Sequence, residues 1–308
     1  MRLGRPLGDL VFFYCLAAPA AAMVLAFALL FYAHIDLSRE ALELQGLKTF
    51  AGARWRPSLE PPPKSEYGLL PAIVGTLTSA GIALLIALPV SVLLAVFLVE
   101  IAPRSLSHLL GLIIDALAGL PSVVYGLWGL YFLGPFLRKN LMEPLHELLG
   151  FLPFFSCKPL SGASVLTAGI LLSIMITPFA SALVYEAYRS VPSVYIEAAY
   201  SLGMTRYEQA MTRLSMIRGA VVSAALLGLG RAMSETAAVT MVVGNAYVLS
   251  PCVFSPAYTI TSLIANQFAE SRGYPLMLSS LFAGSLLLLC VGLIVNAAGL
   301  RALRSVRL

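Results

Sequence analysis

The chain has 308 residues, of which 59% are hydrophobic and only 11% are charged, and its net charge is +5. A soluble domain carries about 25% charged residues, so the composition excludes an ordinary soluble protein and predicts an integral membrane protein. The positive charge does not indicate nucleic-acid binding, because most cations flank apolar segments and no basic run has interleaved aromatics. We therefore expect the chain to contact membrane lipid and no nucleic acid.

A transmembrane helix needs about 20 mainly apolar residues to cross about 30 Å of hydrocarbon. Six segments meet this condition, and all are expected to be helices because an open strand leaves its backbone unsatisfied in lipid. The segments are Leu10–Tyr32, Leu70–Val99, Leu109–Leu133, Val165–Tyr185, Ala220–Val243 and Leu276–Leu300. The first is longer than the core of a cleaved signal peptide, so we expect it to be retained as a span.

The cations near the segment ends predict the orientation. With the N-terminus inside, ten cations are cytoplasmic and nine are external, and the external ones are spread over longer loops. This density favours both termini inside (N-in/C-in) under the positive-inside rule. The ten are Arg2, Arg5, Arg104, Arg189, Arg206, Arg213, Arg218, Arg301, Arg304 and Arg307.

Several features interrupt the apolar pattern. Asp36–Tyr67, which contains Pro61–Pro63, is expected to be a polar external connection, and the short run Phe151–Phe155 an interfacial element. Helix breakers lie inside three of the expected helices. Each alone is interpreted as a simple kink, and together they fit a bundle with a non-uniform interior. They are Pro89, Gly119-Leu120-Pro121 and Thr177-Pro178.

The four cysteines lack the spacing of a metal site. Cys15 and Cys290 lie in apolar runs and are expected to be packing residues. Cys157 and Cys252 fall in loops that the orientation places outside. A disulfide between them is chemically possible there, although a sequence alone does not fix its geometry.

The connection between the fourth and fifth segments predicts two short helices. Proline suits a first helical turn and glycine the position just past a helix end, so Pro192–Leu202 should be helical and stop at Gly203. Thr205 and Glu208 have the spacing of a capping box, which predicts a second helix from Arg206.

The first of these helices contains Glu197-Ala198-Ala199, with Gly203 six residues after the glutamate. The small pair would let a partner approach the backbone closely, and Glu197 would offer it a charge. The alternative is an ordinary amphipathic connecting loop. This pattern resembles the signature loop of ABC importer permeases, which docks onto an ATPase subunit. The family pattern continues to I-x-L-P, whereas Thr212–Ser215 keeps only the leucine.

Two further motifs are more specific. Pro121–Gly129 and Gly228–Asn245 are similar to motifs of phosphate permeases, and Thr259–Glu270 resembles the external loop of the PstC-type subunit. The resemblance runs from about Gly75 to the C-terminus. It implies the type I importer fold, with a core domain over residues 69–308, a coupling loop at 189–218, and an N-terminal span with its external connection over residues 1–68.

Arg231 and Glu235 are charged residues inside the fifth apolar segment. At a spacing of four they would share one helix face, and charges at such depth usually face a polar interior. The functional interpretation is a phosphate pathway, in which the guanidinium binds phosphate oxygens. Glu235 would hold Arg231 or accept a hydrogen bond from protonated phosphate. The alternative is an ion pair that only fixes helix packing.

Further candidates for the lining of the phosphate pathway are Asp115, Ser234, Thr236, Thr240 and Asn245. Asp115 would either pair with Arg231 or border a polar cavity.

The resemblance implies a transport subunit that is not itself an enzyme. Its implied partners are a second, PstA-type permease subunit, a cytoplasmic PstB-type ATPase that binds ATP and Mg²⁺, and an external PstS-type phosphate-binding protein. The sequence of this chain has no P-loop, so we expect it to need no cofactor of its own. The alternatives are a permease for molybdate, tungstate or sulfate, and an ion-coupled secondary transporter, although no inverted repeat is visible. A catalytic dyad or metal cluster would favour an intramembrane enzyme, but His34, His108 and His146 cluster with nothing.

Overall fold

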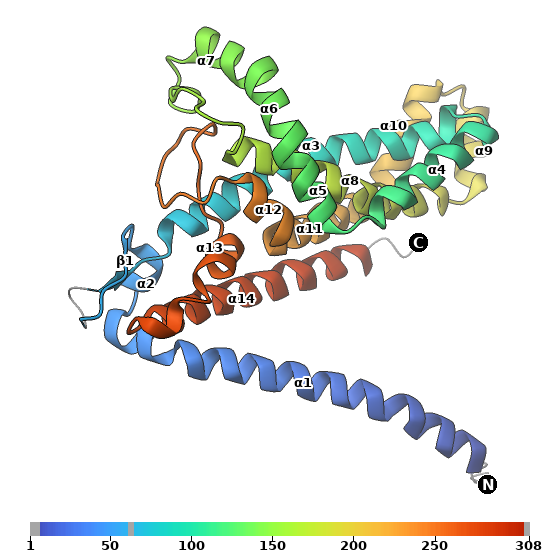
Figure 1. Cartoon of the computed structure of the whole chain (residues 1–308). Coiled ribbons are helices and arrows are strands. Elements are labelled where there is room, and N and C mark those ends of the chain that lie inside the picture. The colour runs from blue at the N-terminus through green and yellow to red at the C-terminus, as the bar shows by residue number, and fades with distance from the viewer. Residues whose placement is uncertain (1–6, 61–64, 305–308) are drawn as a thin grey trace.

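The computed structural model describes residues 7–60 and 65–304, which form a helical bundle with one short β-hairpin. Arg2, Arg5 and Arg307, which entered the orientation argument, lie outside the described residues, as do Pro61–Pro63. The long helices run between two ends of the molecule (Figure 1). One end carries the strands β1 (Trp55–Arg56) and β2 (Glu66–Tyr67) and the short helix α2 (Lys48–Ala51). The other end carries α9 (Ser193–Ser201) and α10 (Arg206–Met216).

Within residues 7–60 and 65–304, 4 helices are long and apolar enough to cross a membrane, and the count rises to 6 if each of two bent helix pairs is one span. The four agree with four of the expected segments. They are α1 (Leu7–Gln45), α3 (Leu70–Val96), α8 (Val165–Arg189) and α14 (Met277–Arg304). Pro89 and Pro178 lie inside α3 and α8 without ending them.

The third expected helix is broken. The chain turns by 93° between α4 (Arg104–Ala118) and a helical run over Ser122–Leu149. Pro121 has φ −59° and ψ 139°, so extended backbone separates the two parts, and proline then starts a new helix without an N–H. The run consists of α5 (Ser122–Trp128), η2 (Gly129–Leu133), α6 (Gly134–Leu137), η3 (Arg138–Met142) and α7 (Glu143–Leu149).

The fifth expected helix is also not continuous. A bend of 65° comes just before this segment, between α10 (Arg206–Met216) and α11 (Arg218–Ser234). Glu235 then has φ −68° and ψ 126°, so the backbone is extended before α12 (Ala237–Val242) begins. A loop follows, and α13 (Ile260–Gln267) and η4 (Ser271–Gly273) lead into α14.

The connection expected over Asp36–Tyr67 is more structured than the sequence suggested. α1 continues to Gln45, so its 39 residues extend about 58 Å, well beyond about 30 Å of hydrocarbon. The helix α2 (Lys48–Ala51) and the antiparallel strands β1 (Trp55–Arg56) and β2 (Glu66–Tyr67) follow. Ser279 Oγ of α14 accepts a hydrogen bond from Ala41 N–H at 2.8 Å, which fixes the end of α1 against the bundle.

Small residues let the central helices approach closely. Ala80, Ala83 and Ala168 are fully buried between α3 and α8, and a Cβ on Gly169 would lie 2.6 Å from Ile82. Such close packing is typical of membrane helices, whose association depends on van der Waals contact. A second apolar cluster lies toward α9 and α10, and its buried members include Ala95, Val184, Tyr188, Val191, Ile217 and Ala220.

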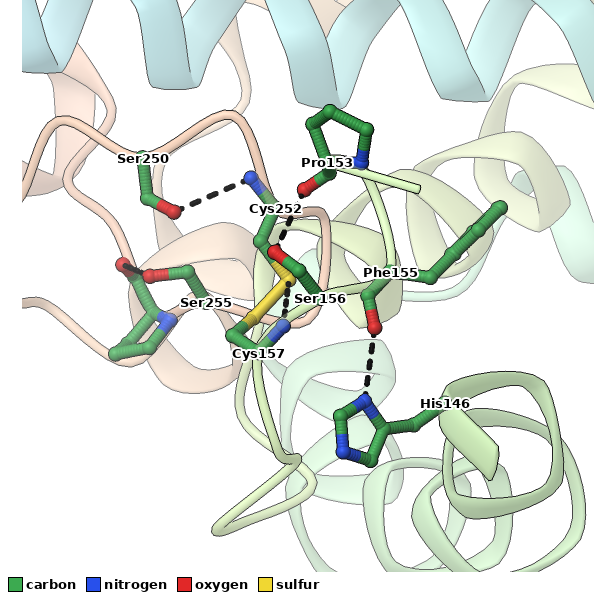
Figure 2. Close-up of a disulfide and its surroundings, with 9 residues drawn as sticks. His146, Pro153, Phe155, Ser156, Cys157, Ser250, Cys252 and Ser255 are labelled. Atoms are coloured by element: carbon green, nitrogen blue, oxygen red, sulfur yellow. Dashed lines mark hydrogen bonds between the residues drawn. A yellow bond between two sulfur atoms is a disulfide. The ribbon is translucent and has the colours of Figure 1, made fainter. Parts of the chain in front are cut away.

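Cys157 and Cys252 form a disulfide across a sequence separation of 95 residues (Figure 2). The bond joins the segment after α7 to the loop after α12, so the possibility left open by the sequence is realised. In the chain-entropy model, a cross-link over a loop of this length stabilises the fold by about 4–5 kcal/mol. The adjoining run Phe151–Phe155 forms turns, and the carbonyl of Phe155 lies 2.9 Å from His146 Nδ1 of α7.

Candidate functional site

The connection between α8 and α11 folds as two helices joined by a sharp turn. The first, α9 (Ser193–Ser201), follows Pro192 in extended conformation. Gly203 has φ +73°, the left-handed conformation that glycine adopts most readily. The N–H of Met204 donates to the carbonyl of Ala199 at 3.1 Å. The predicted helix over Pro192–Leu202 and its stop at Gly203 are therefore confirmed to within one residue.

The capping box at the start of α10 is also confirmed. Thr205 Oγ1 accepts from Glu208 N–H, and Glu208 Oε2 accepts from Thr205 N–H at 2.7 Å. The Thr205 hydroxyl also donates to Glu208 Oε2 at 2.8 Å. The backbone N–H of Thr205, and after it this hydroxyl, lower the pKa of the Glu208 carboxyl. The sequence did not single out Gln209, which is 6% exposed and donates to the carbonyl of Met204 at 2.9 Å. Together these contacts make the turn rigid.

The exposed surface of this helix pair carries large apolar and aromatic side chains, and we call this surface the apolar loop face. Its members range from 45% to 77% exposed and comprise Val194, Tyr195, Tyr200, Leu202, Tyr207 and Met211. Glu197 and Ala198 are exposed beside them, but Ala199 is only 7% exposed. Ala199 therefore packs inside the protein, and only Ala198 of the small pair is exposed to a partner.

The apolar loop face lies at one end of the molecule. Figure 1 places α9 and α10 at the end where the described part of α1 begins and where α14 finishes. The disulfide-linked loops and α7 lie away from that end. The long helices thus connect this helix pair to the loops of the opposite end.

Arg231 and Glu235 do not lie on one continuous helix, because α11 ends at Ser234. No ion pair joins them among the described residues. The Arg231 side chain is exposed, with Cζ 5.8 Å from the centre of the Phe179 ring. Glu235 is half-buried, and its Oε1 accepts weakly from Ala238 N–H at 3.4 Å. The expectation that Glu235 holds Arg231 is therefore wrong for this conformation.

Ser234 and Thr236 lie on another side of the break. Both residues line a cavity of about 500 Å³, and neither Arg231 nor Glu235 borders this cavity. This cavity lies among α1, α11, α13 and α14 and also includes His34, Thr261, Ser285 and Asn296. Thr240 donates to the carbonyl of Thr236 at 2.7 Å. Asn245, at φ +49°, donates to the carbonyl of Thr240, also at 2.7 Å.

Asp115 borders a different cavity, of about 600 Å³, between α4 and α8. Arg231 is not among its lining residues, so the structure does not bring these two side chains together. The Asp115 side chain thus lies beside this cavity, and no ion pair joins it to Arg231 among the described residues. The other charged or titratable residues around it are Arg104, His108, Tyr185, Glu186 and Arg189.

One cluster was missed by reasoning from sequence. Arg213 Nη1 of α10 lies 2.6 Å from Glu100 Oε1, at the end of the second span. Tyr188 of α8 donates its hydroxyl to the same oxygen at 2.9 Å. The sequence did contain one sign of this cluster, because Glu100 is an acid directly after an apolar segment. No sequence pattern connects Glu100 with Arg213, which lies 113 positions later.

Comparison with known proteins gives consistent results. A probable phosphate transport system permease protein PstC of Methanocaldococcus jannaschii is 45% identical over 86% of this chain and 84% of its own length. A phosphate transport system permease protein PstC of Xylella fastidiosa is 42% identical over 87% of this chain and 84% of its own.

Solved structures show the same fold at low sequence identity. A bacterial alginate ABC transporter, in complex with a pentasaccharide-bound periplasmic protein, matches with a TM-score of 0.61 at 15% identity, over 97% of this chain and 98% of its own. The methionine ABC transporter MetNI in an inward-facing conformation matches with a TM-score of 0.50 at 20% identity, over 78% of this chain and 95% of its own.

The match to a family model covers most of the bundle. It spans residues 87–307, which include the α9–α10 pair, the break at Glu235 and all of α14. The solved relatives agree with the type I importer fold expected from the sequence. The chain belongs to the family of binding-protein-dependent transport system inner membrane components.

Proposed function

We propose that this chain is the permease subunit of an ATP-driven importer of inorganic phosphate and forms half of its translocation pathway. The identity of 45% with a phosphate permease over most of both chains carries the choice of cargo. The helix pair at one end supports a subunit that is driven by a partner. The fold alone would not choose phosphate, because its solved relatives are named for alginate and methionine.

The apolar loop face is the proposed contact with the cytoplasmic PstB-type ATPase. Exposed tyrosines beside leucine, valine and methionine have the composition of an interface centre. The capping box and Gly203 hold α9 and α10 at a fixed angle, so little ordering is needed when the partner binds. ATP and Mg²⁺ would be bound by that ATPase.

The orientation we propose is N-in/C-in. The described start of α1, the end of α14 and the α9–α10 pair lie at the same end of the molecule, as this orientation requires. The opposite end, with the disulfide-linked loops, would face the external PstS-type binding protein. An oxidising compartment on that side suits the Cys157–Cys252 bond.

Arg231 is the proposed phosphate-binding residue of this half of the pathway. A guanidinium inside a membrane span is costly unless it faces a polar interior, and Arg231 is exposed on the isolated subunit without an acidic partner among the described residues. A second, PstA-type permease subunit would cover this side and complete the anion site. Glu235 lies at the adjoining break, and Ser234 donates its hydroxyl to the Arg231 carbonyl at 3.1 Å. Ser234, Thr236, Asn245 and Asp115 would have supporting roles.

The test uses the complete complex, reconstituted in vesicles with its ATPase, second permease and binding protein. We expect phosphate-loaded binding protein to stimulate ATP hydrolysis and phosphate uptake. Arg231→Ala should reduce phosphate uptake by about 100-fold, whereas Arg231→Lys should retain part of it, because lysine keeps the charge and loses the bidentate geometry.

Two outcomes would contradict this assignment. If the wild-type complex takes up no phosphate, the cargo is wrong. If Arg231→Ala transports phosphate as the wild type does, the cargo stands and the role of Arg231 is wrong. Arg218→Ala, an exposed cation at the start of α11, is the matched control.

A further inference from the structure

Three side chains from three elements meet where the α9–α10 pair joins the bundle. Arg213 of α10 contacts Glu100 Oε1 at 2.6 Å, and Tyr188 of α8 donates to the same oxygen at 2.9 Å. The Arg213 guanidinium also lies over the Tyr188 ring, with Cζ 5.3 Å from the ring centre. Each residue therefore contacts both others, and we call them the Arg213 cluster.

The Arg213 cluster is less exposed than two other ion pairs of the protein. The Arg213 side chain is 15% exposed and that of Glu100 is 31% exposed. By contrast, the Arg39–Glu43 and Arg138–Glu143 pairs have side chains that are 43–71% exposed. Exposed pairs contribute little to stability, whereas removing one member of a shielded pair leaves the other charge uncompensated. The geometry of the Arg213–Glu100 pair therefore resists separation.

A π-helical turn sets the direction of Glu100. Residues Phe97–Ile101 form η1 at the end of α3, and Ala102 N–H donates to the carbonyl of Phe97 at 2.9 Å, five residues back. A π-turn inserts one residue into the α-helical repeat and is frequent at functional sites. Without that residue, positions after it would shift by about 100° around the helix axis. The local structure thus departs from a regular helix where the acid meets Arg213.

We propose that Arg213 and Glu100, with Tyr188, transmit movement of the α9–α10 pair to α3 and α8. This inference rests on the proposed function, because it requires an ATPase that moves the pair. The capping box and Gln209 make the pair rigid internally, and the apolar contacts of Ile217 and Val191 attach it without directional bonds. The Arg213 cluster adds the directional bonds, so Arg213 and Glu100 are positioning residues.

The guanidinium of Arg213 has unused donors, so its hydrogen bonds to Glu100 can rearrange while the ion pair stays intact. Its Nε is buried and has no acceptor among the described residues. Only Nη1 bonds to Glu100, so the planar fork has a second donor free for the other carboxylate oxygen. A shift of α10 along the carboxylate would therefore move the hydrogen bonds while the ion pair persists.

The experiment measures phosphate uptake per ATP hydrolysed by the full reconstituted complex. Arg213→Gln and Glu100→Gln should each lower this ratio by about tenfold, as expected when one partner of a shielded pair is removed. ATPase should still copurify with both variants, because neither residue belongs to the apolar loop face. The double charge swap Arg213→Glu with Glu100→Arg should recover a substantial part of the ratio, whereas Arg218→Gln should leave it at the wild-type value.

Three results would overturn the proposal. An unchanged uptake per ATP in Arg213→Gln would show that coupling does not pass through this cluster. Loss of the ATPase from the purified Arg213→Gln complex would assign the residue to docking. A double swap that assembles, yet couples no better than either single variant, would exclude a direct pair. If the wild-type complex failed to import phosphate, the proposed function would fail instead, which separates the two claims.

Discussion

At Glu235 the chain leaves the helix and resumes it after Thr236, although Ser234-Glu235-Thr236 contains neither proline nor glycine. The break is held from outside the segment, because Thr261 of α13 donates its hydroxyl to the Glu235 carbonyl at 2.9 Å. Reasoning from the sequence identified Arg231 and Glu235 as charges in an apolar segment, but it did not predict that the helix ends between Ser234 and Ala237, and no ion pair joins the two charges among the described residues. That geometry depends on a residue 26 positions away.

The position of Glu235 leads to a prediction about anion selectivity. Near neutral pH phosphate retains a proton that sulfate lacks, so a carboxylate can accept a hydrogen bond from phosphate only. Glu235→Gln should lower the preference for phosphate over sulfate by about tenfold, or ~1.4 kcal/mol, close to the value of a hydrogen bond to a charged group. Competition by sulfate in uptake assays measures this preference.

The glutamine substitution is suitable because it preserves the local structure. A glutamine Oε1 can still accept from Ala238 N–H, as Glu235 Oε1 does now. Thr240→Val, on the helix that begins at Ala237, is the control for altered packing. Equal selectivity of Glu235→Gln and wild type would remove Glu235 from anion discrimination and leave the role of Arg231 untouched.

At the scale of single elements, the two short helices were the most predictable part of the protein. Their ends follow from local chemistry, with an N–H-free proline before α9, a left-handed glycine after it, and reciprocal Thr205–Glu208 bonds. The π-helical turns η1, η2 and η3 were not predicted. An inserted residue leaves no pattern in an apolar sequence, and it is stabilised by what the helix packs against.

Gly203 provides a test of the turn between these helices. A Cβ there would meet nothing within 4 Å, so a substitution changes only the backbone energy. At φ +73° a β-branched residue costs about 1–2 kcal/mol, while asparagine tolerates this region. Gly203→Val should therefore weaken ATPase binding by about tenfold and Gly203→Asn by much less.

Titration of the ATPase against vesicles containing each Gly203 variant measures this difference. Equal weakening by valine and asparagine would show that the glycine is needed for close approach of the ATPase and not for its backbone conformation. Unchanged binding in both variants would place the ATPase contact away from the turn.

For the whole molecule, the two ends have different chemistry. At one end, α9 and α10 present an apolar face and the Arg213 cluster joins them to the spans. Away from the end that carries α9 and α10, the Cys157–Cys252 disulfide joins the loops that follow α7 and α12. A covalent bond there keeps these loops together whether or not the opposite end moves. The sequence predicted which segments lie at each end from the order of spans, but the disulfide needed the folded geometry.

This polarity predicts which cysteines are accessible from each side of the membrane. In a chain with Cys15 and Cys290 replaced by alanine, the disulfide leaves no other free thiol. Leu160→Cys, at a position 83% exposed near the disulfide, should then react with a membrane-impermeant maleimide added to intact cells. Leu202→Cys, at a position 77% exposed on the apolar loop face, should react only after the membrane is opened.

The opposite labelling pattern would reverse the orientation and place the α9–α10 pair outside, where no ATP-hydrolysing partner could reach it. Labelling of Leu202→Cys should also fall when the ATPase is present in opened membranes, since the partner covers that face. Leu160→Cys is the control for this step, because the ATPase would bind at the other end. Protection of both positions, or of neither, would contradict docking at the apolar loop face even if the orientation is correct.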